Sequence, residues 1–280
     1  MRLAWLVVIT GCSFSGPGTS PTTGGDDDVA PPDAAVAIDA GETTTPDAPV
    51  VAGFAPCATT NSFGLVGCYE FEDDLTKGSL HDSSPSMLDA QTTGLMAATR
   101  ASGQAARVMT SNATRVAQNA VLDRAAGFSV LMWVNPTTLP GDGKVMGLVD
   151  HEQQYAIAIG RDEEDVTLRC ILTGGQYYEW ADDVPANKWS LAACTWDGIH
   201  LCAYRWSAAS DHAMNCFEPS DGIASTGAQG LAIGSLSASG APSFRFDGAI
   251  DSLHVYNRAL SEGELCSEVG QTSTHCLESQ

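Results

Sequence analysis

The chain has 280 residues, 44% of them hydrophobic, which is enough for one large β domain or two small ones. Charged residues make up 17%, yet 34 are acidic and 13 basic, giving a formal net charge of -21. Because phosphate contacts need clusters of Lys and Arg, this balance excludes nucleic acid as a partner.

The first residues predict export and a lipid anchor. Arg2 gives a basic start, and the apolar run over residues 4–10 is too short to span a bilayer. The Ile-Thr-Gly-Cys sequence that ends at Cys12 resembles the bacterial lipobox, whose cysteine is lipidated. We predict a signal peptide over residues 1–11 and lipidation of Cys12; an ordinary secretory signal is the alternative. Ser13 lacks the aspartate that resembles an inner-membrane retention signal, so we expect a cell-envelope lipoprotein of the outer membrane, held there only by its lipid.

Residues 12–55 predict a disordered tether. The segment is rich in Pro, Ala, Thr and Gly, and it contains seven acidic residues and no basic one. Such a composition buries too little apolar surface to offset the entropy of ordering the chain. The folded domain is therefore expected over residues 56–280.

Short apolar or β-branched runs separated by turns follow the tether. They lie at residues 65–71, 105–109, 128–134, 144–149, 155–160, 166–172, 189–196, 199–204, 231–234 and 249–256. Asp197-Gly198 predicts a hairpin turn with positive φ angles. Ser261 and Glu264 have the spacing of a capping box, which predicts a short helix over residues 262–269. Many strands and one helix predict an all-β antiparallel sandwich of the jelly-roll kind.

The cysteines indicate disulfide bonds. Besides Cys12, the chain has Cys57, Cys68, Cys170, Cys194, Cys202, Cys216, Cys266 and Cys276. An even number in an exported chain predicts pairing. A zinc site is the weaker alternative, because no Cys-x-x-Cys sequence occurs. Sequence proximity favours Cys202–Cys216 and Cys266–Cys276, and the other pairings stay open.

Four stretches, in order, resemble the laminin-G-like domains of the concanavalin A-like lectin/glucanase superfamily. They are residues 64–71 with the Asp-Ser-Ser loop at 81–85, Phe128-Ser-Val-Leu-Met-Trp-Val-Asn-Pro136, the Trp-led strand and turn at 188–198, and the closing strand and helix start at 246–261. The resemblance covers residues 62–268 and implies a jelly-roll fold.

The resemblance also implies Ca²⁺ near the rim of the sandwich. Asp251 has the parity of Leu253 and Val255, so we expect it to point inward, where a carboxylate needs a cation or hydrogen-bond donors. Asp82 is its expected companion. The family usually has a second acidic residue where this chain has Ser252, and hydrogen bonds from backbone N–H groups to Asp251 are the alternative to calcium.

Aromatic residues at 176–180 are the candidate glycan-binding site. Tyr178 and Trp180 share one face of an expected strand, and Asp182 follows in an acidic turn. Rings beside polar side chains stack on sugars, and exposed aromatic residues mark binding surfaces. The alternative is that Tyr178 and Trp180 pack into the core.

A run of carboxylates raises the question of catalysis. Glu70, Glu72 and Asp74 would share one face if their strand continued, with a spacing that suits glycoside hydrolysis. The run coincides with the family's non-catalytic opening strand and enters a polar loop, which favours exposed loop carboxylates. We therefore predict a non-enzymatic, lipid-anchored module that binds carbohydrate through rim loops. The alternatives are a protein-binding adhesion or structural envelope module and a jelly-roll glycoside hydrolase.

Overall fold

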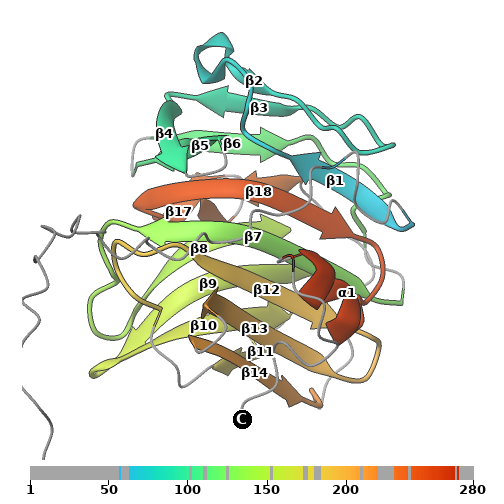
Figure 1. The fold of residues 1–280 in the computed structure, drawn as a ribbon, viewed down its shortest axis with the longest axis vertical. Helices are drawn as coiled ribbons and strands as arrows, with labels where there is room; N and C mark the ends of the chain where they lie inside the picture. The colour runs from blue at the N-terminus through green and yellow to red at the C-terminus, as the bar shows by residue number, and fades with distance from the viewer. Residues whose placement is uncertain are drawn as a thin grey trace, which may run out of the picture. The chain divides into compact units, whose positions relative to one another are not determined.

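Two β-sheets with a common hydrophobic core form the body of the molecule (Figure 1). The computed structural model describes residues 57, 63–100, 103–109, 112–123, 126–151, 154–172, 176–179, 184–208, 211–219, 230–238, 241–268 and 270, with backbone alone at 176–179, 237–238 and 241–243. All of them belong to one compact unit, Asp47–Gln280. The predicted all-β sandwich is confirmed.

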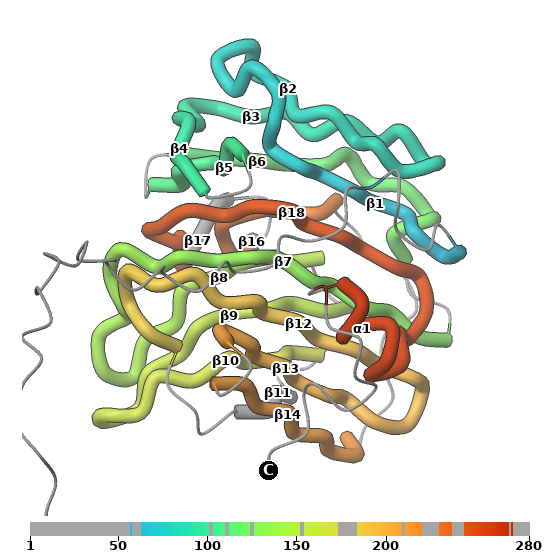
Figure 2. The backbone as a smooth tube through the Cα atoms, in the orientation of Figure 1, coloured from blue at the N-terminus to red at the C-terminus, as the bar shows by residue number. Residues whose placement is uncertain are grey.

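The first sheet, sheet A, has eight strands among the described residues. In spatial order they are β14 (Asp211–Phe217), β13 (Leu201–Ala208), β12 (Ser190–Trp196), β7 (Phe128–Pro136), β18 (Gly248–Tyr256), β5 (Gly103–Val108) and β4 (Met96–Arg100), with β1 (Leu65–Tyr69) also paired to β18. Figure 2 shows β18 between β7 and β1 in the middle of this sheet. The first half of β18 pairs with β5 and its second half with β1. A bulge separates the two halves, and Ser252 within it has a φ of 50°.

The second sheet, sheet B, has ten strands in the described part of the chain. Its main path is β11 (Gln176–Glu179), β10 (Asp165–Leu172), β9 (Tyr155–Asp162), β8 (Lys144–His151), β15 (Leu231–Ile233), β6 (Ala113–Val116), β3 (Ala90–Thr93) and β2 (Ser79–Leu80). A hairpin of β16 (Ser235–Ala238) and β17 (Ala241–Arg245) joins β8, with one parallel contact between Arg245 and Gly147. The backbone of β16 crosses directly over Gly147, where a Cβ would lie 2.1 Å from the Leu236 nitrogen.

Both faces of the central strands of sheet A are buried, so β7, β12 and β18 bury residues of both parities. On the inner face, Val130 belongs to the large cluster between the sheets, together with Ile157 of sheet B. On the outer face, Trp133 belongs to a second cluster that includes Leu265 of helix α1 (Glu262–Glu268). Alternation along β7 therefore divides residues between two cores, because successive side chains of a strand point to opposite faces.

Disulfide bonds fasten the sandwich at three described places. Cys57 is bonded to Cys68, Cys170 to Cys194, and Cys202 to Cys216, the last being the pair expected across a hairpin. The Cys170–Cys194 bond joins β10 of sheet B to β12 of sheet A through the core between them. Cys266 is also disulfide-bonded. Its expected partner Cys276 lies outside the described residues, as does Cys12.

Two short sequence motifs, the capping box at Ser261 and Glu264 and the hairpin turn at Asp197-Gly198, can be compared with the structure. The capping box is confirmed: Ser261 N–H donates to Glu264 Oε2 over 2.9 Å, and Glu264 N–H to Ser261 Oγ over 3.3 Å. A hydrogen bond from Arg258 is the largest cause that lowers the pKa of Glu264 to about 2. The predicted hairpin at Asp197-Gly198 is confirmed, because β12 and β13 pair across it, but the prediction of a positive φ at both residues is wrong. Trp196 pairs with Leu201, so the loop has four residues, and of Asp197 and Gly198 only the glycine has a positive φ, 99°.

Besides α1, the described residues contain one short helical element. A 3-10 turn, η1 (Leu75–Lys77), precedes β2 and ends at Gly78, whose φ of 78° favours glycine. None of the helices in the described ranges has the length and apolar character needed to cross a membrane.

Candidate functional site

A row of cross-strand neighbours runs over the outer face of sheet B. From one edge to the other, the register joins Ser79, Gln91, Arg115, Ala232, Asp150, Ala156, Ile171 and Tyr177. Directly opposed residues in paired strands share a face. The row lies on the outer face, because the alternate positions Ile233, Val149 and Ile157 belong to the core between the sheets.

The row combines polar side chains with small ones. Ser79 and Gln91 are exposed, Arg115 is half-buried, and Asp150 is 9% exposed. Ala232 lies between Arg115 and Asp150 in the register and is fully buried, so the exposed part of the strip ends at Arg115. The exposed part of the strip therefore presents a hydroxyl, an amide and a guanidinium on three neighbouring strands. Hydroxyl-rich ligands are recognised by such a mixture of hydrogen-bond donors and acceptors.

Ser79, the first residue of the row, also lines a small polar pocket. The pocket has a volume of about 100 Å³, and it is lined by Asp73, Asp74, Lys77, Ser79, His81 and Asp89. All six residues lie between the end of β1 and the start of β3. We call this group the edge pocket. The aspartates of the edge pocket can accept hydrogen bonds, the ammonium group of Lys77 can donate them, and the hydroxyl of Ser79 can do either.

Turn chemistry positions the walls of the edge pocket. Asp74 caps η1 by accepting hydrogen bonds from Thr76 N–H and Oγ1. Asp73 Oδ2 accepts from the backbone N–H of His81 over 2.7 Å, and Asp89 Oδ1 lies 3.0 Å from Nδ1 of the same histidine. These bonds connect the loop before β2 with the loop after it, so the pocket is held from two sides.

Two carboxylates of the edge pocket, Asp74 and Asp89, have pKa values below the ordinary value of an aspartate. Hydrogen bonds from the side chain and backbone of Thr76 lower the pKa of Asp74. A hydrogen bond from the backbone N–H of Asp82 is the largest cause that lowers the pKa of Asp89. Lys77 lies 3.8 Å from Asp74 and supplies the only positive charge among the pocket-lining residues apart from a protonated His81.

The expected aromatic site is only partly covered by the described residues. Trp180 and Asp182 lie outside them. The register places Tyr178 opposite Cys170, which belongs to the core between the sheets. Tyr177 instead lies opposite Ile171 and so belongs to the row on the outer face. The ligand-binding role of Tyr178, Trp180 and Asp182 stays a prediction.

Asp82, one of the two expected calcium ligands, orders its own loop. Its Oδ1 accepts hydrogen bonds from the N–H groups of Cys68 and Ser84, and its Oδ2 accepts from Ser84 Oγ and Leu88 N–H, over 2.8 to 2.9 Å. A carboxylate that already accepts four hydrogen bonds does not fit a Ca²⁺ site, because the cation would have to displace them.

Asp251, the other expected ligand, lies on the opposite face from the one predicted. The bulge at Ser252 breaks the parity with Leu253, so Asp251 lies opposite Trp133 on the outer face of sheet A. There it is 3% exposed, and its Oδ2 lies 2.7 Å from Arg100 Nη1. The guanidinium occupies the position that a cation was expected to take, so this residue does not fit Ca²⁺ either.

The three carboxylates considered for catalysis do not share a strand face. The strand β1 ends at Tyr69, and Phe71 has a φ of 57°, which turns the chain. Glu70 accepts a hydrogen bond from Cys57 N–H, and Glu72 accepts one from Gln104 N–H over 2.9 Å. With Asp74 capping η1, each carboxylate has a separate structural partner.

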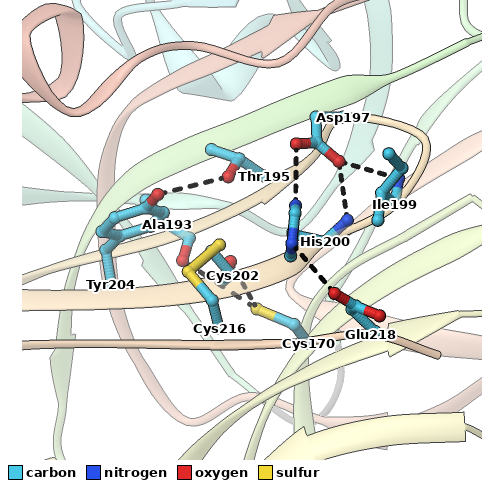
Figure 3. The surroundings of a disulfide bond; sticks show 10 residues. All are labelled: Cys170, Ala193, Thr195, Asp197, Ile199, His200, Cys202, Tyr204, Cys216 and Glu218. Atoms are coloured by element: carbon cyan, nitrogen blue, oxygen red, sulfur yellow. Dashed lines mark hydrogen bonds and ion pairs between the residues drawn. A yellow bond between two sulfur atoms is a disulfide. The ribbon is translucent and has the colours of Figure 1, made fainter.

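The hairpin tip between β12 and β13 carries a histidine between two carboxylates (Figure 3). His200 Nδ1 lies 3.1 Å from Asp197 Oδ2, and His200 Nε2 lies 3.3 Å from Glu218 Oε1. Asp197 also accepts hydrogen bonds from the backbone N–H groups of Ile199 and His200, which closes the loop. The side-chain hydrogen bond to Asp197 is the largest cause that raises the pKa of His200.

We expect an NMR titration to give His200 a pKa above its ordinary value of 6.5. Because the folded-state pKa is raised, the stabilisation by protonated His200 is complete at pH values below 6.5 and is lost as pH rises through the folded-state pKa. Asp197→Asn is expected to move the pKa back toward 6.5, whereas Asp142→Asn, at another exposed loop, leaves it unchanged. Equal values for the wild type and Asp197→Asn would contradict this account.

Sequence reasoning missed the edge pocket. Its residues come from a loop, a 3-10 turn and a two-residue strand, none of which has hydrophobic periodicity. The one available signal was the Asp-Ser-Ser loop at residues 82–84, which lies between His81 and Asp89.

Comparison with known families gives one match. Residues 108–266, more than half of the chain, match a laminin G family that is described as the concanavalin A-like lectin/glucanases superfamily. Among curated proteins, none matches the chain.

Several solved structures share the fold. Domain 4 of an extracellular arabinanase from Geobacillus stearothermophilus, in complex with arabinotriose, has a TM-score of 0.55 at 19% identity, over 73% of this chain and 98% of its own. The binding domain of botulinum neurotoxin DC in complex with SialylT has a TM-score of 0.53 at 11% identity, over 76% of this chain and 52% of its own. The same toxin domain in complex with rat synaptotagmin II has a TM-score of 0.51, again at 11% identity, over 75% and 52%. This chain thus spans about half the length of the toxin chains, and the similarity shows the fold.

Proposed function

Because the chain belongs to the concanavalin A-like lectin/glucanases superfamily, we propose that it binds carbohydrate and does not cleave it. The observation that carries this proposal is the polar strip of sheet B that ends in the edge pocket. Ser79 belongs to both, so the pocket and the exposed part of the strip, Ser79, Gln91 and Arg115, form one continuous polar surface across three neighbouring strands. An oligosaccharide is an extended ligand with many hydroxyls, and it suits such a surface better than a compact ligand does.

Two of the solved structures support the proposal. The arabinanase domain was solved with arabinotriose and the toxin domain with SialylT, so this fold holds saccharides in other proteins. The contacts of Glu70 and Glu72 support binding without hydrolysis, because both carboxylates accept backbone hydrogen bonds in separate places. Glycoside hydrolysis needs two carboxylates that face one substrate.

A glycan array probed with the full oxidised chain tests the proposal. We expect binding to one class of oligosaccharide, and the double variant Lys77→Ala/Ser79→Ala should weaken it by roughly tenfold or more, since hydrogen bonds to charged groups contribute about 1.5–3 kcal/mol. Lys144→Ala, at an exposed position on β8, is the matched control and should bind as the wild type does.

Three outcomes would contradict the proposal or part of it. Silence across the array would overturn carbohydrate binding. Unchanged affinity of the double variant would exclude the edge pocket as the site. Shorter products in the mass spectrum of a bound oligosaccharide, if they disappear with Glu72→Gln, would favour a hydrolase.

Protein binding is the second candidate function. The toxin domain that shares this fold was also solved with rat synaptotagmin II, so the same scaffold holds a protein ligand elsewhere. A protein partner would be favoured by silence on the glycan array together with co-purification of one envelope protein at fixed stoichiometry.

We further infer that the module is attached to the outer membrane through a lipid on Cys12. The lipobox-like sequence before Cys12 and the acidic segment after it support this inference. Mass spectrometry of the exported protein should show a lipidated N-terminus, and Cys12→Ser should release an unlipidated form. An unmodified Cys12 in the wild type would refute the anchor.

A further inference from the structure

Among the residues that the structure describes, one group combines cysteine and histidine side chains at metal-binding distances. The sulfur atoms of Cys57 and Cys68 and one ring nitrogen of His254 all lie within 4.8 Å of one another. All three residues are buried, with exposed fractions of 7%, 0% and 0%. In the oxidised protein the two sulfur atoms are joined as a disulfide.

Backbone pairing brings these residues together. Cys68 in β1 lies directly opposite His254 in β18, so the two side chains share a face of sheet A. In the oxidised protein Cys57 is held beside them by the disulfide. Its backbone N–H also donates to Glu70, a contact that remains after the disulfide is reduced.

A carboxylate from α1 completes the surroundings of the imidazole. Glu268 Oε2 lies 3.3 Å from His254 Nδ1, and Glu268 Oε1 accepts a hydrogen bond from the hydroxyl of Tyr256 over 3.1 Å. Glu268 is 5% exposed. A carboxylate that orients a histidine is the usual partner of that histidine in zinc sites, because it fixes the tautomer and raises the basicity of the ligating nitrogen.

We propose that the reduced form of this cluster binds Zn²⁺ through Cys57, Cys68 and His254, with Glu268 orienting the imidazole. Two thiolates and an imidazole are preferred zinc ligands, and a closed tetrahedral site takes one further ligand. The proposal concerns a site separate from the polar strip of sheet B and does not depend on carbohydrate binding.

The chemistry balances with a dithiol as the reductant. The dithiol transfers two electrons and two protons to the Cys57–Cys68 bond, is itself oxidised to a disulfide, and leaves two thiols. Zn²⁺ then displaces the two thiol protons into solvent and forms two zinc–sulfur bonds. The disulfide and the zinc site are therefore alternative ways to cross-link the same two residues, and reoxidation must expel the metal.

Cobalt substitution and alkylation test the proposal on the full chain. After reduction by a dithiol and its removal, Co²⁺ should give a thiolate-to-metal charge-transfer band at one equivalent. The band should persist in Cys202→Ser/Cys216→Ser, the matched control. It should be lost in Cys57→Ser/Cys68→Ser and shifted in His254→Gln. The oxidised wild type should give no band.

A second measurement needs no variant and so does not depend on the folding of altered chains. Zn²⁺ should protect Cys57 and Cys68 of the reduced wild type from alkylation, as read by peptide mass spectrometry, and a chelator should remove the protection. Alkylation of these two cysteines at equal rates with and without Zn²⁺ would overturn the proposal, as would a cobalt band that survives in Cys57→Ser/Cys68→Ser.

Discussion

Replacing Arg100 by Met is expected to lower the free energy of unfolding by about 3–5 kcal/mol, the cost of leaving one partner of a buried ion pair alone. The side chains of Arg100 and Asp251 are 2% and 4% exposed and lie 2.7 Å apart. The guanidinium also lies 4.3 Å from the centre of the Trp133 ring. Without it, the carboxylate of Asp251 would remain buried beside an aromatic ring with no opposite charge.

The pair as a whole is expected to contribute far less than this loss suggests. Burial raises the pKa of Asp251 and lowers the pKa of Arg100, so desolvation disfavours the charged form of each. The double variant Arg100→Met/Asp251→Leu should therefore recover most of the stability. Lys188→Met, which removes an exposed ion pair with Asp211, is the control and should cost about 0–1 kcal/mol. Urea unfolding of the four proteins measures all three differences, and a double variant as unstable as Arg100→Met would contradict the argument.

Removing the Cys170–Cys194 bond is expected to be the second large loss. Cys170→Ala/Cys194→Ala opens a closed loop of sequence separation 24 and should lower the free energy of unfolding by about 3 kcal/mol. For a domain of this size the loss corresponds to a fall in Tm of roughly 6–12 °C. The bond is the described covalent link between the two sheets, and both sulfur atoms lie in the core between them.

A matched disulfide on one sheet provides the control. Cys202 and Cys216 are directly opposite each other in β13 and β14, which are already joined by backbone hydrogen bonds. Their replacement by Ala should therefore lower Tm less than the loss of the link between the sheets. Calorimetry of both double variants measures the two falls in Tm. A larger fall for Cys202→Ala/Cys216→Ala than for Cys170→Ala/Cys194→Ala would refute the prediction.

The sequence predicted the positions of two kinds of strand: those buried on both faces, and those whose residues resemble the laminin-G-like family. The strand at residues 128–134 was placed within two residues, because hydrophobic and aromatic side chains fill both of its faces. The strands β2 and β3 were missed, because residues such as Gln91 and Thr93 are exposed and leave no continuous apolar run. β14 was missed for the same reason, since a strand at the edge of sheet A is mostly half-exposed.

The errors at the site came from breaks in strand regularity. The run from Glu70 to Asp74 alternates in sequence, but the positive φ of Phe71 ends the alternation in space. Asp251 has the parity of Leu253 only if β18 is regular, and the bulge between them lies where β18 changes its neighbour from β5 to β1. This change of neighbour involves β1 and β18, which are almost two hundred residues apart in the sequence. A local sequence pattern therefore does not predict it.

The central place of β18 has a consequence for how the chain assembles. β18 is the last strand among the described residues, and three strands that precede it in the sequence, β1, β5 and β7, all pair with it. β1 has no other strand partner in the described part of the chain. Until residue 256 has been synthesised, β1 and β7 cannot be joined into one sheet. The nascent chain therefore has to wait with an open gap in sheet A, and its unpaired strand edges are exposed to wrong partners during that time. Closure of this gap by β18 is therefore a late step in the assembly of sheet A.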